Sequence, residues 1–210
     1  MHSQNHEDDR ILEYFNTLYG KDYTGTLLDI GANDGVTVSN SRAFIERGWV
    51  GDLVEPAAIS LKRLKELYKN KPEVKIHGIA LDTKAARVKF YESSGLFSSK
   101  DSGLLSTIIP EEVTKRGWVY KVKFNEYEVD ALDFQTFSKQ AMYSVWDFIS
   151  IDAEGKDWDI LQQIDLNKVK CQCLCVEHNS IEAQKYIDYA EQFGFSMLLI
   201  NYTNVVMIKA

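Results

Sequence analysis

Acidic side chains stand at the ends of four apolar runs in this 210-residue chain, and they are the residues best suited to hold or transform a ligand. Asp29 lies near the end of the first run, and Glu55, Asp152 and Glu177 each directly follow a later one. The carboxyl ends of parallel strands meet at one edge of a sheet, where open α/β folds bind their ligands. Capping of the following helix is the structural alternative for any single carboxylate. Four of them on one edge favour a binding or catalytic site.

A glycine-bracketed turn, Gly31-Ala32-Asn33-Asp34-Gly35, follows the first apolar run. Its Gly-x-x-x-Gly spacing differs from the Gly-x-Gly-x-x-Gly of dinucleotide-binding loops, and Asn33-Asp34 would add a carboxylate where a pyrophosphate binds. Glu55 comes roughly 20 residues after the glycines, about the separation at which an acidic side chain meets a nucleoside ribose. The turn therefore favours a cofactor with a cationic amino-acid end and a ribose, as in S-adenosylmethionine, over NAD.

Apolar runs alternate with helical patterns along most of the chain, and this order predicts the sheet that positions these residues. Repeated strand–helix units are typical of an α/β, Rossmann-like, doubly wound and mostly parallel seven-stranded sheet, here closed by an antiparallel hairpin. The strands predicted for that sheet are Thr26–Ile30, Trp49–Val54, Val74–Ala80, Asp147–Ile151, Cys171–Val176, Phe195–Ile200 and Val205–Lys209.

Helices are predicted on either side of these strands. Residues 1–20 contain an N-terminal helix, and a second helix is predicted over Val36–Arg47. Pro56 stands in the first turn of a third, where its missing N–H is not needed. Ser180 is the expected N-cap of the last helix.

The middle of the chain departs from this alternation. Two strands, Arg87–Glu92 and Tyr120–Val129, fall within an inserted region at 85–130. The polar stretch Ser93–Gly117 between them is long for a loop in a compact domain, and such segments are usually functional. We interpret it as a substrate-facing lid of one domain that spans residues 1–210.

Composition limits the classes of partner and compartment. A net charge of −7 disfavours a nucleic-acid partner bound by bulk electrostatics. The acidic N-terminus is not a signal peptide, and no apolar run reaches the ~20 residues that span a membrane. Cys171, Cys173 and Cys175 alternate as buried strand residues do, and a metal-site interpretation lacks a turn and a fourth ligand. We therefore expect a cytoplasmic protein without a membrane partner.

Several motifs together resemble a known family. The stretch LLDIGANDG, Leu27–Gly35, looks like the glycine-rich first motif of class I S-adenosylmethionine-dependent methyltransferases, and Val54-Glu55-Pro56 looks like their acidic ribose-binding motif. Within that class the chain resembles the FkbM-type methyltransferases. That closer likeness rests on residues 3–8, Ile79–Asp82, Leu105–Thr107 and Ile149–Gly155.

The resemblance implies roles for the residues of the glycine-rich turn. Gly31, Asn33 and Gly35 would hold the methionine end of the cofactor, with Asp29 near its ammonium group. Glu55 would accept hydrogen bonds from both ribose hydroxyls, as a bidentate carboxylate can.

The remaining cofactor contacts come from three other places in the chain. Pro56 completes the ribose motif, and Ile79 and Ala80 would flank the adenine. Asp152 would lie beside the sulfonium and the incoming nucleophile. This family is associated with O-methylation of hydroxyls on small molecules or sugars, so the expected acceptor is a small molecule or a glycan.

A neutral hydroxyl needs a base or a metal to become a good nucleophile. The candidate bases are Asp152, Glu154 and His178, all at the expected carboxyl edge. Asp152 with Glu177 could instead hold Mg²⁺, which prefers oxygen ligands. Two other classes stay open, an NAD-dependent oxidoreductase and a non-catalytic protein that binds partners on the same fold.

Overall fold

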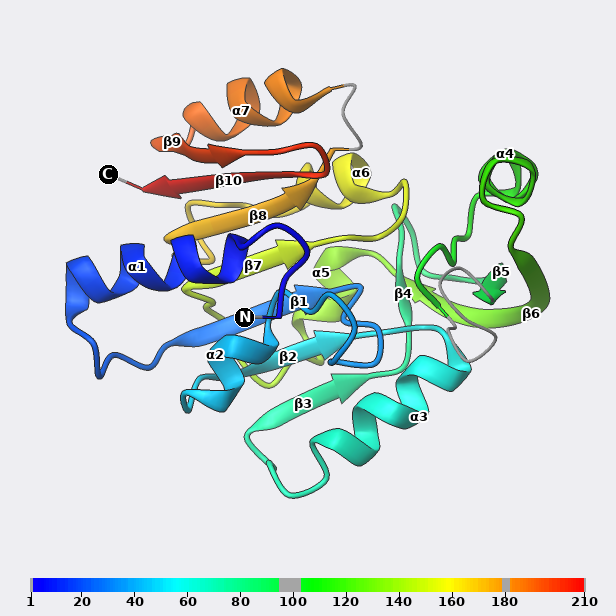
Figure 1. Cartoon of the computed structure of the whole chain (residues 1–210), viewed down its shortest axis with the longest axis horizontal. Coiled ribbons are helices and arrows are strands. Elements are labelled where there is room, and N and C mark those ends of the chain that lie inside the picture. Colours follow the sequence, from blue (N-terminus) through cyan, green and yellow to red (C-terminus); the bar gives the residue numbers. More distant parts are fainter. Residues whose placement is uncertain (1, 95–102, 179–181, 210) are drawn as a thin grey trace.

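The computed structural model describes residues 2–94, 103–178 and 182–209 and contains a central seven-stranded sheet (Figure 1). The strand order is β3-β2-β1-β7-β8-β10-β9. β10 runs antiparallel to both of its neighbours, β8 and β9, and the other neighbouring strands pair in parallel. The order reverses between β1 and β7, which pair directly. This confirms the predicted doubly wound sheet and its closing hairpin. The strands are β1 (Thr26–Ile30), β2 (Val50–Val54), β3 (Val74–His77), β7 (Phe148–Ile151), β8 (Cys173–Glu177), β9 (Phe195–Ile200) and β10 (Asn204–Lys209).

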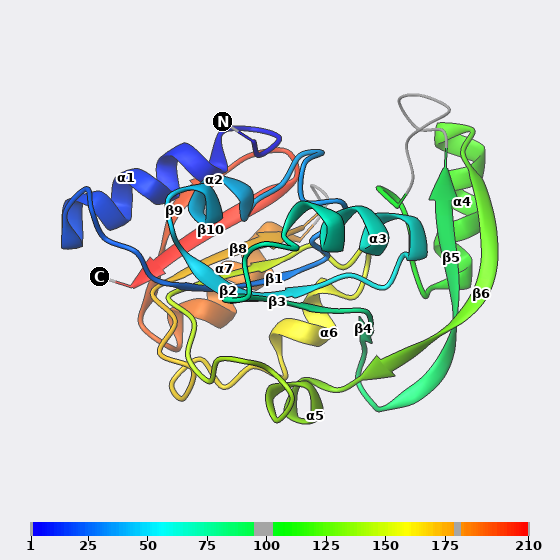
Figure 2. The ribbon, with the colours of Figure 1, turned by 90° about the horizontal axis from the view of Figure 1, so that it is seen from below.

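Helices cover both faces of this sheet (Figure 2). Successive side chains of a strand point to opposite faces, so Leu27 joins one apolar core and Leu28 the other. The first core lies under α1 (Glu7–Tyr19), α2 (Arg42–Glu46) and α3 (Ala58–Leu67). The second lies under α5 (Phe134–Ser138), α6 (Asp157–Leu161) and α7 (Ala183–Glu191). The three cysteines are buried and belong to these two cores.

A second, three-stranded sheet projects beyond the carboxyl ends of the central strands (Figures 1 and 2). It has the order β4-β6-β5, and we call it, together with α4, the arm. Its elements are β4 (Ala80–Leu81), β5 (Ala86–Ser94), α4 (Pro110–Tyr120) and β6 (Lys123–Leu132). The arm therefore occupies the inserted region that the sequence indicates.

The arm changes two predicted strands. The strand predicted over Val74–Ala80 ends at His77, and Ala80 pairs instead with Ala131 of β6. Gly78, a residue type that weakens a strand interior, directly follows His77 in this edge strand. The strand predicted from Tyr120 begins only at Lys123, because the preceding residues complete α4.

Two helix predictions also need correction. The helix predicted over Val36–Arg47 is short and starts at Arg42. Val38 adopts a left-handed backbone with φ 46°, which a continuous helix does not allow. Pro56 precedes α3 instead of standing in its first turn, because Ala57 is extended and caps the helix. The predicted N-cap Ser180 lies outside the described residues.

Within the described ranges, no helix combines the length and the apolar character required to cross a bilayer.

Candidate active site

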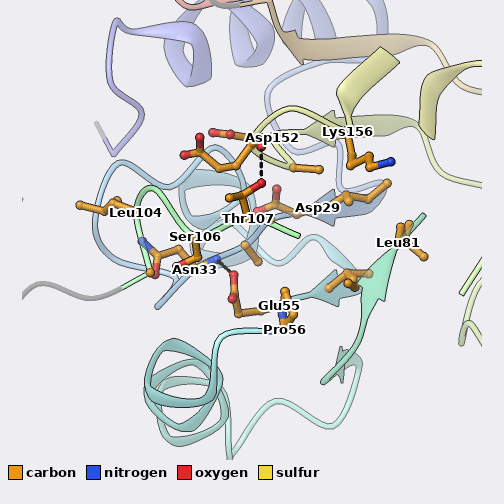
Figure 3. A pocket seen from close by; sticks show the side chains of 18 of the residues that line it. Asp29, Asn33, Glu55, Pro56, Leu81, Leu104, Ser106, Thr107, Asp152 and Lys156 are labelled. Atoms are coloured by element: carbon orange, nitrogen blue, oxygen red, sulfur yellow. Dashed lines mark hydrogen bonds between the residues drawn. The ribbon is translucent and has the colours of Figure 1, made fainter. Parts of the chain in front are cut away.

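A pocket opens at the carboxyl ends of β1, β2 and β7, where the strand order reverses (Figure 3). Ligands of open α/β sheets bind at this switch point. The central strands supply one wall and the arm supplies the other. Predicted site residues on its lining are Asp29, Gly31, Asn33, Glu55, Pro56, Ile79, Ala80, Asp152 and Glu154.

The glycine turn is tied to the strands on both sides of β1. The N–H groups of Gly31 and Ala32 both donate to the Val54 carbonyl, at 3.0 and 3.1 Å. Gly31 has φ 90°, and a Cβ there would lie 1.8 Å from the Asp152 carbonyl oxygen. Only glycine fits between β2 and the loop after β7, so this residue lets the backbone form the pocket floor.

The far end of the turn has a different role from the one the resemblance implies. Gly35 is not among the pocket-lining residues, and a Cβ there would meet Leu64 of α3 at 2.7 Å. The Asp34 carboxylate likewise binds the local backbone: its Oδ1 accepts hydrogen bonds from the N–H groups of Val36 and Thr37. The charge that would oppose a pyrophosphate thus comes from other carboxylates in the pocket.

Glu55 is buried beside the turn. Its Oε2 accepts from the Asn33 N–H at 2.8 Å (Figure 3). Its Oε1 accepts from the Ala57 N–H at 2.6 Å. Burial raises the pKa of Glu55 to about 8, against the lowering effect of these two hydrogen bonds. The two hydrogen bonds fix the carboxyl group in place, with Pro56 next to it on the lining, and hydroxyl donors of a ligand would favour its ionised, accepting form.

Asp29 lies deeper, inside β1, and is almost fully buried. Hydrogen bonds from the hydroxyls of Ser41 and Ser150 lower its pKa, but burial outweighs them and raises it to about 6. A cationic ligand would favour the ionised form. On the opposite wall Ile79 and Ala80 form an apolar surface suited to a flat ring.

Three oxygen atoms in the pocket lining are buried without a hydrogen-bond partner among the described residues. They are Oδ1 of Asn33, Oδ1 of Asn40 and Oδ1 of Asp152. All three can accept hydrogen bonds, and leaving such an atom unpaired costs about 1–3 kcal/mol. A ligand that carries hydroxyl and ammonium donors would pair them. This set of acceptors, with Glu55 and the Gly31 turn, thus fits the hydroxyl and ammonium donors of S-adenosylmethionine.

Two of the three candidate bases meet at this pocket. Asp152 lies at the end of β7, and burial with neighbouring carboxylates raises its pKa well above the usual range. Glu154, two residues on, has its carboxylate paired with the Arg116 guanidinium from α4. Burial raises the pKa of Glu154 to about 7, while Arg116 acts in the opposite direction. Asp152 keeps an unpartnered oxygen and Glu154 does not carry one, so Asp152 is the better placed base.

His178 lies apart from these two. It is not among the pocket-lining residues, and its Nε2 lies 3.0 Å from the carbonyl oxygen of Asn201. Its backbone N–H donates to the Thr203 carbonyl at 2.8 Å. The geometry therefore assigns His178 to the contact between β8 and the closing hairpin.

The acidic pair considered for Mg²⁺ has a third member. Oxygen atoms of Asp152, Asp157 and Glu177 lie within 4.8 Å of one another. Both oxygens of Asp157 already accept backbone N–H groups, from Ala153 at 2.7 Å and Gly155 at 3.0 Å. The cluster offers hard oxygen ligands of the type that Mg²⁺ uses.

The arm covers the pocket with a segment that we call the roof, residues 103–108. Thr107 donates from its hydroxyl to the Glu154 carbonyl at 3.0 Å. Arg116 is buried and also donates to the Leu105 carbonyl at 3.3 Å. The side chains of Thr107 and Arg116 thus join the roof to the loop after β7. Arg116 carries no sequence signal of this role, because it lies within α4 and outside the motif Leu105–Thr107.

Comparison with known proteins agrees with this geometry. The family model described as "Methyltransferase FkbM domain" matches residues 29–200. The search of curated proteins finds no match. Among solved structures, an FkbM methyltransferase from Methylobacillus flagellatus KT is similar, with 15% identity and a TM-score of 0.57 over 92% of this chain. This chain covers 47% of that one, about half its length.

Two further structures show the same fold at low identity. Magnesium protoporphyrin IX methyltransferase from Synechocystis PCC 6803, with bound SAM, is 8% identical with a TM-score of 0.50, covering 97% of this chain and 78% of its own. A methyltransferase from Geobacter sulfurreducens is also 8% identical with a TM-score of 0.50, covering 99% and 80%. The sheet order, the pocket at its switch point and the family match over residues 29–200 together place the chain: it belongs to the FkbM methyltransferase domain family.

Proposed function

We propose that this chain binds S-adenosylmethionine and transfers its methyl group to a hydroxyl of a small molecule or sugar. The observation that carries the proposal is the group of three buried, unpartnered acceptor oxygens in one pocket at the switch point of the sheet. Those atoms need a ligand with several N–H and O–H donors. Family membership selects S-adenosylmethionine from such ligands.

Three groups of residues would bind the ribose, the methionine end and the adenine of the cofactor. Glu55 would accept from the ribose hydroxyls, Asn33 and Asp29 would face the methionine end, and Ile79 with Ala80 would cover the adenine. Bound there, S-adenosylmethionine supplies an electrophilic methyl group. The roof would exclude water from the sulfonium side, which favours a displacement that consumes charge.

Asp152 is the proposed base. Its unpartnered Oδ1 would accept the proton of the acceptor hydroxyl while the new oxygen–carbon bond forms and the sulfur–carbon bond breaks. Burial and the neighbouring carboxylates raise the pKa of this carboxyl, which makes its ionised form a stronger base. Glu154 would stay paired with Arg116 and hold the roof in place. An acidic site and a net charge of −7 favour a neutral or cationic acceptor over a nucleic acid.

Calorimetric titration with S-adenosylhomocysteine, with NAD as the control ligand, tests cofactor class. We expect binding of S-adenosylhomocysteine only, and Glu55→Ala should weaken it by about 1–3 kcal/mol, the cost of unpaired polar groups. Binding of NAD alone would support an oxidoreductase instead. Binding of S-adenosylhomocysteine without turnover across a broad panel of hydroxylated acceptors would support a non-catalytic role.

Asp152→Asn tests the base. The variant should still bind S-adenosylhomocysteine but lose at least about 100-fold in turnover, the range of general-base catalysis. Turnover of the wild type should survive treatment with EDTA. If EDTA abolishes turnover and Mg²⁺ restores it, the oxygens of Asp152, Asp157 and Glu177 would be metal ligands and Asp152 would not act as the base.

A further inference from the structure

The segment between the glycine turn and α2 forms a pocket wall where the sequence predicts a helix. Thr37, Val38, Ser39 and Asn40 all line the pocket. Val38 is β-branched and has φ 46°, a conformation that costs free energy for such a residue. The chain therefore keeps these residues out of α2 and places them on the lining of the pocket.

Asn40 has an amide group whose orientation is fixed by its neighbours. Its side chain is buried, and Nδ2 donates to the Ser150 hydroxyl oxygen at 3.2 Å. The Ser150 hydroxyl in turn hydrogen-bonds to the Asp29 carboxylate, so its hydrogen points there and its oxygen can only accept. The reverse amide orientation would place an oxygen against that oxygen. Oδ1 of Asn40 is thereby turned away, buried and without a partner among the described residues.

The position of this oxygen selects the part of the ligand that it meets. Ser150 lies in β7 and pairs in register with Asp29 of β1, whereas Glu55 follows β2 on the other side of β1. Two strand spacings, about 10 Å, thus separate the Asn40 contact from the ribose contact. Beside the buried Asp29 carboxylate, a donor with positive charge is the complementary group.

We propose that Asn40 is a further cofactor-binding residue, whose amide oxygen accepts a hydrogen bond from the α-ammonium group of S-adenosylmethionine. The inference rests on the proposed function and deepens it, because it assigns the methionine end of the same cofactor. The chain from Asp29 through Ser150 to Asn40 would form the polar end of the pocket, opposite Glu55.

Two ligands distinguish a contact between Asn40 and the α-ammonium group from a general disturbance of the pocket. S-adenosylhomocysteine carries the amino-acid end, and 5′-methylthioadenosine has the same adenosine and sulfur without it. Calorimetry on the full chain should show that Asn40→Ala lowers affinity for S-adenosylhomocysteine about tenfold. Affinity for 5′-methylthioadenosine should stay within about twofold. Asn125→Ala, a change of the same type at an exposed position on β6, should alter neither.

Asn40→Ser removes the same amide oxygen but keeps a small polar side chain beside Ser150, so it serves if the alanine variant does not fold, and it should lower affinity for S-adenosylhomocysteine in the same direction. An equal loss for both ligands, or an unchanged affinity for S-adenosylhomocysteine in both variants, would overturn the assignment. If the wild type binds neither ligand, the proposed function itself fails. If the wild type binds both ligands and Asn40→Ala has no effect, only the assignment of Asn40 fails.

Discussion

The two walls of the pocket are built in different ways. On the central-sheet wall, Glu55 and Gly31 are fixed by backbone hydrogen bonds to residues of the neighbouring turn and strand. On the arm wall, the roof is fixed by side chains, chiefly Thr107 and Arg116, that reach the loop after β7. One wall depends on the geometry of a parallel sheet, and the other depends on a few long-range polar contacts.

This difference indicates that the two walls have different roles. The backbone hydrogen bonds of the sheet wall hold its acceptor oxygens in place, which suits a site for one cofactor. Under the proposed function the roof would have to admit that cofactor and release its product, and contacts made by two side chains can break without disturbing the sheet. Variants on each wall should therefore fail in different ways.

The largest effect is expected on the sheet wall, for Gly31→Ala. The added Cβ would meet the Asp152 carbonyl oxygen at 1.8 Å in a backbone with φ 90°, so we expect a loss of about 3–5 kcal/mol in the free energy of unfolding. Gly20→Ala is the matched control, because φ there is 93° and no atom lies within 4 Å. It should cost only about 1–2 kcal/mol in urea unfolding. Equal losses would mean that backbone strain alone, and not the close approach to β7, requires glycine.

The arm wall should respond next, to Arg116→Met. Removing the buried guanidinium leaves Glu154 among other carboxylates, and we expect a loss of about 2–4 kcal/mol. Hydrogen exchange should speed up over the roof and α4 while β1 stays protected. The neighbouring variant Lys115→Met removes an exposed ion pair to Glu112 and should cost less than about 1 kcal/mol. Faster exchange throughout the central sheet would contradict the separation of the two walls.

The smallest effect per unit of pH is a pH dependence carried by Glu55, because one titrating group changes the free energy of unfolding by at most about 1.4 kcal/mol per pH unit. Its pKa is about 8 in the folded protein and 4.5 as an ordinary carboxyl, so the folded state binds more protons between these values. The stability that this group contributes is complete below about pH 4.5 and is lost as pH rises through 8. Urea unfolding from pH 5 to 8 should thus show a falling free energy, with a shallower fall in Glu55→Gln. An identical slope in both proteins would remove Glu55 as its source.

Spacing along the chain was sufficient to predict the sheet wall. Gly31, Glu55 and Asp152 each follow an apolar run that can be recognised locally, and a parallel sheet brings the ends of such runs together. The same logic placed His178 at the edge, where the structure instead turns it toward the hairpin. Strand order predicts which loops meet but does not determine the direction of each side chain.

Asn40 and Arg116 were not predicted, for different reasons. Asn40 lies in a stretch whose pattern favours a helix, and only the left-handed turn at Val38 brings it into the pocket. Arg116 reaches Glu154 across 38 positions of sequence, through the packing of the arm on the sheet edge. Neither role follows from a local preference.

The sequence by itself determined the doubly wound sheet, the glycine turn and the acidic residues that follow its strands. These depend on local propensity and on the fixed direction of parallel strands. Only the tertiary structure decided which of those carboxylates keeps a free oxygen and which is neutralised. That outcome depends on what the arm places opposite each one, and on a backbone turn at Val38 that no local pattern specifies.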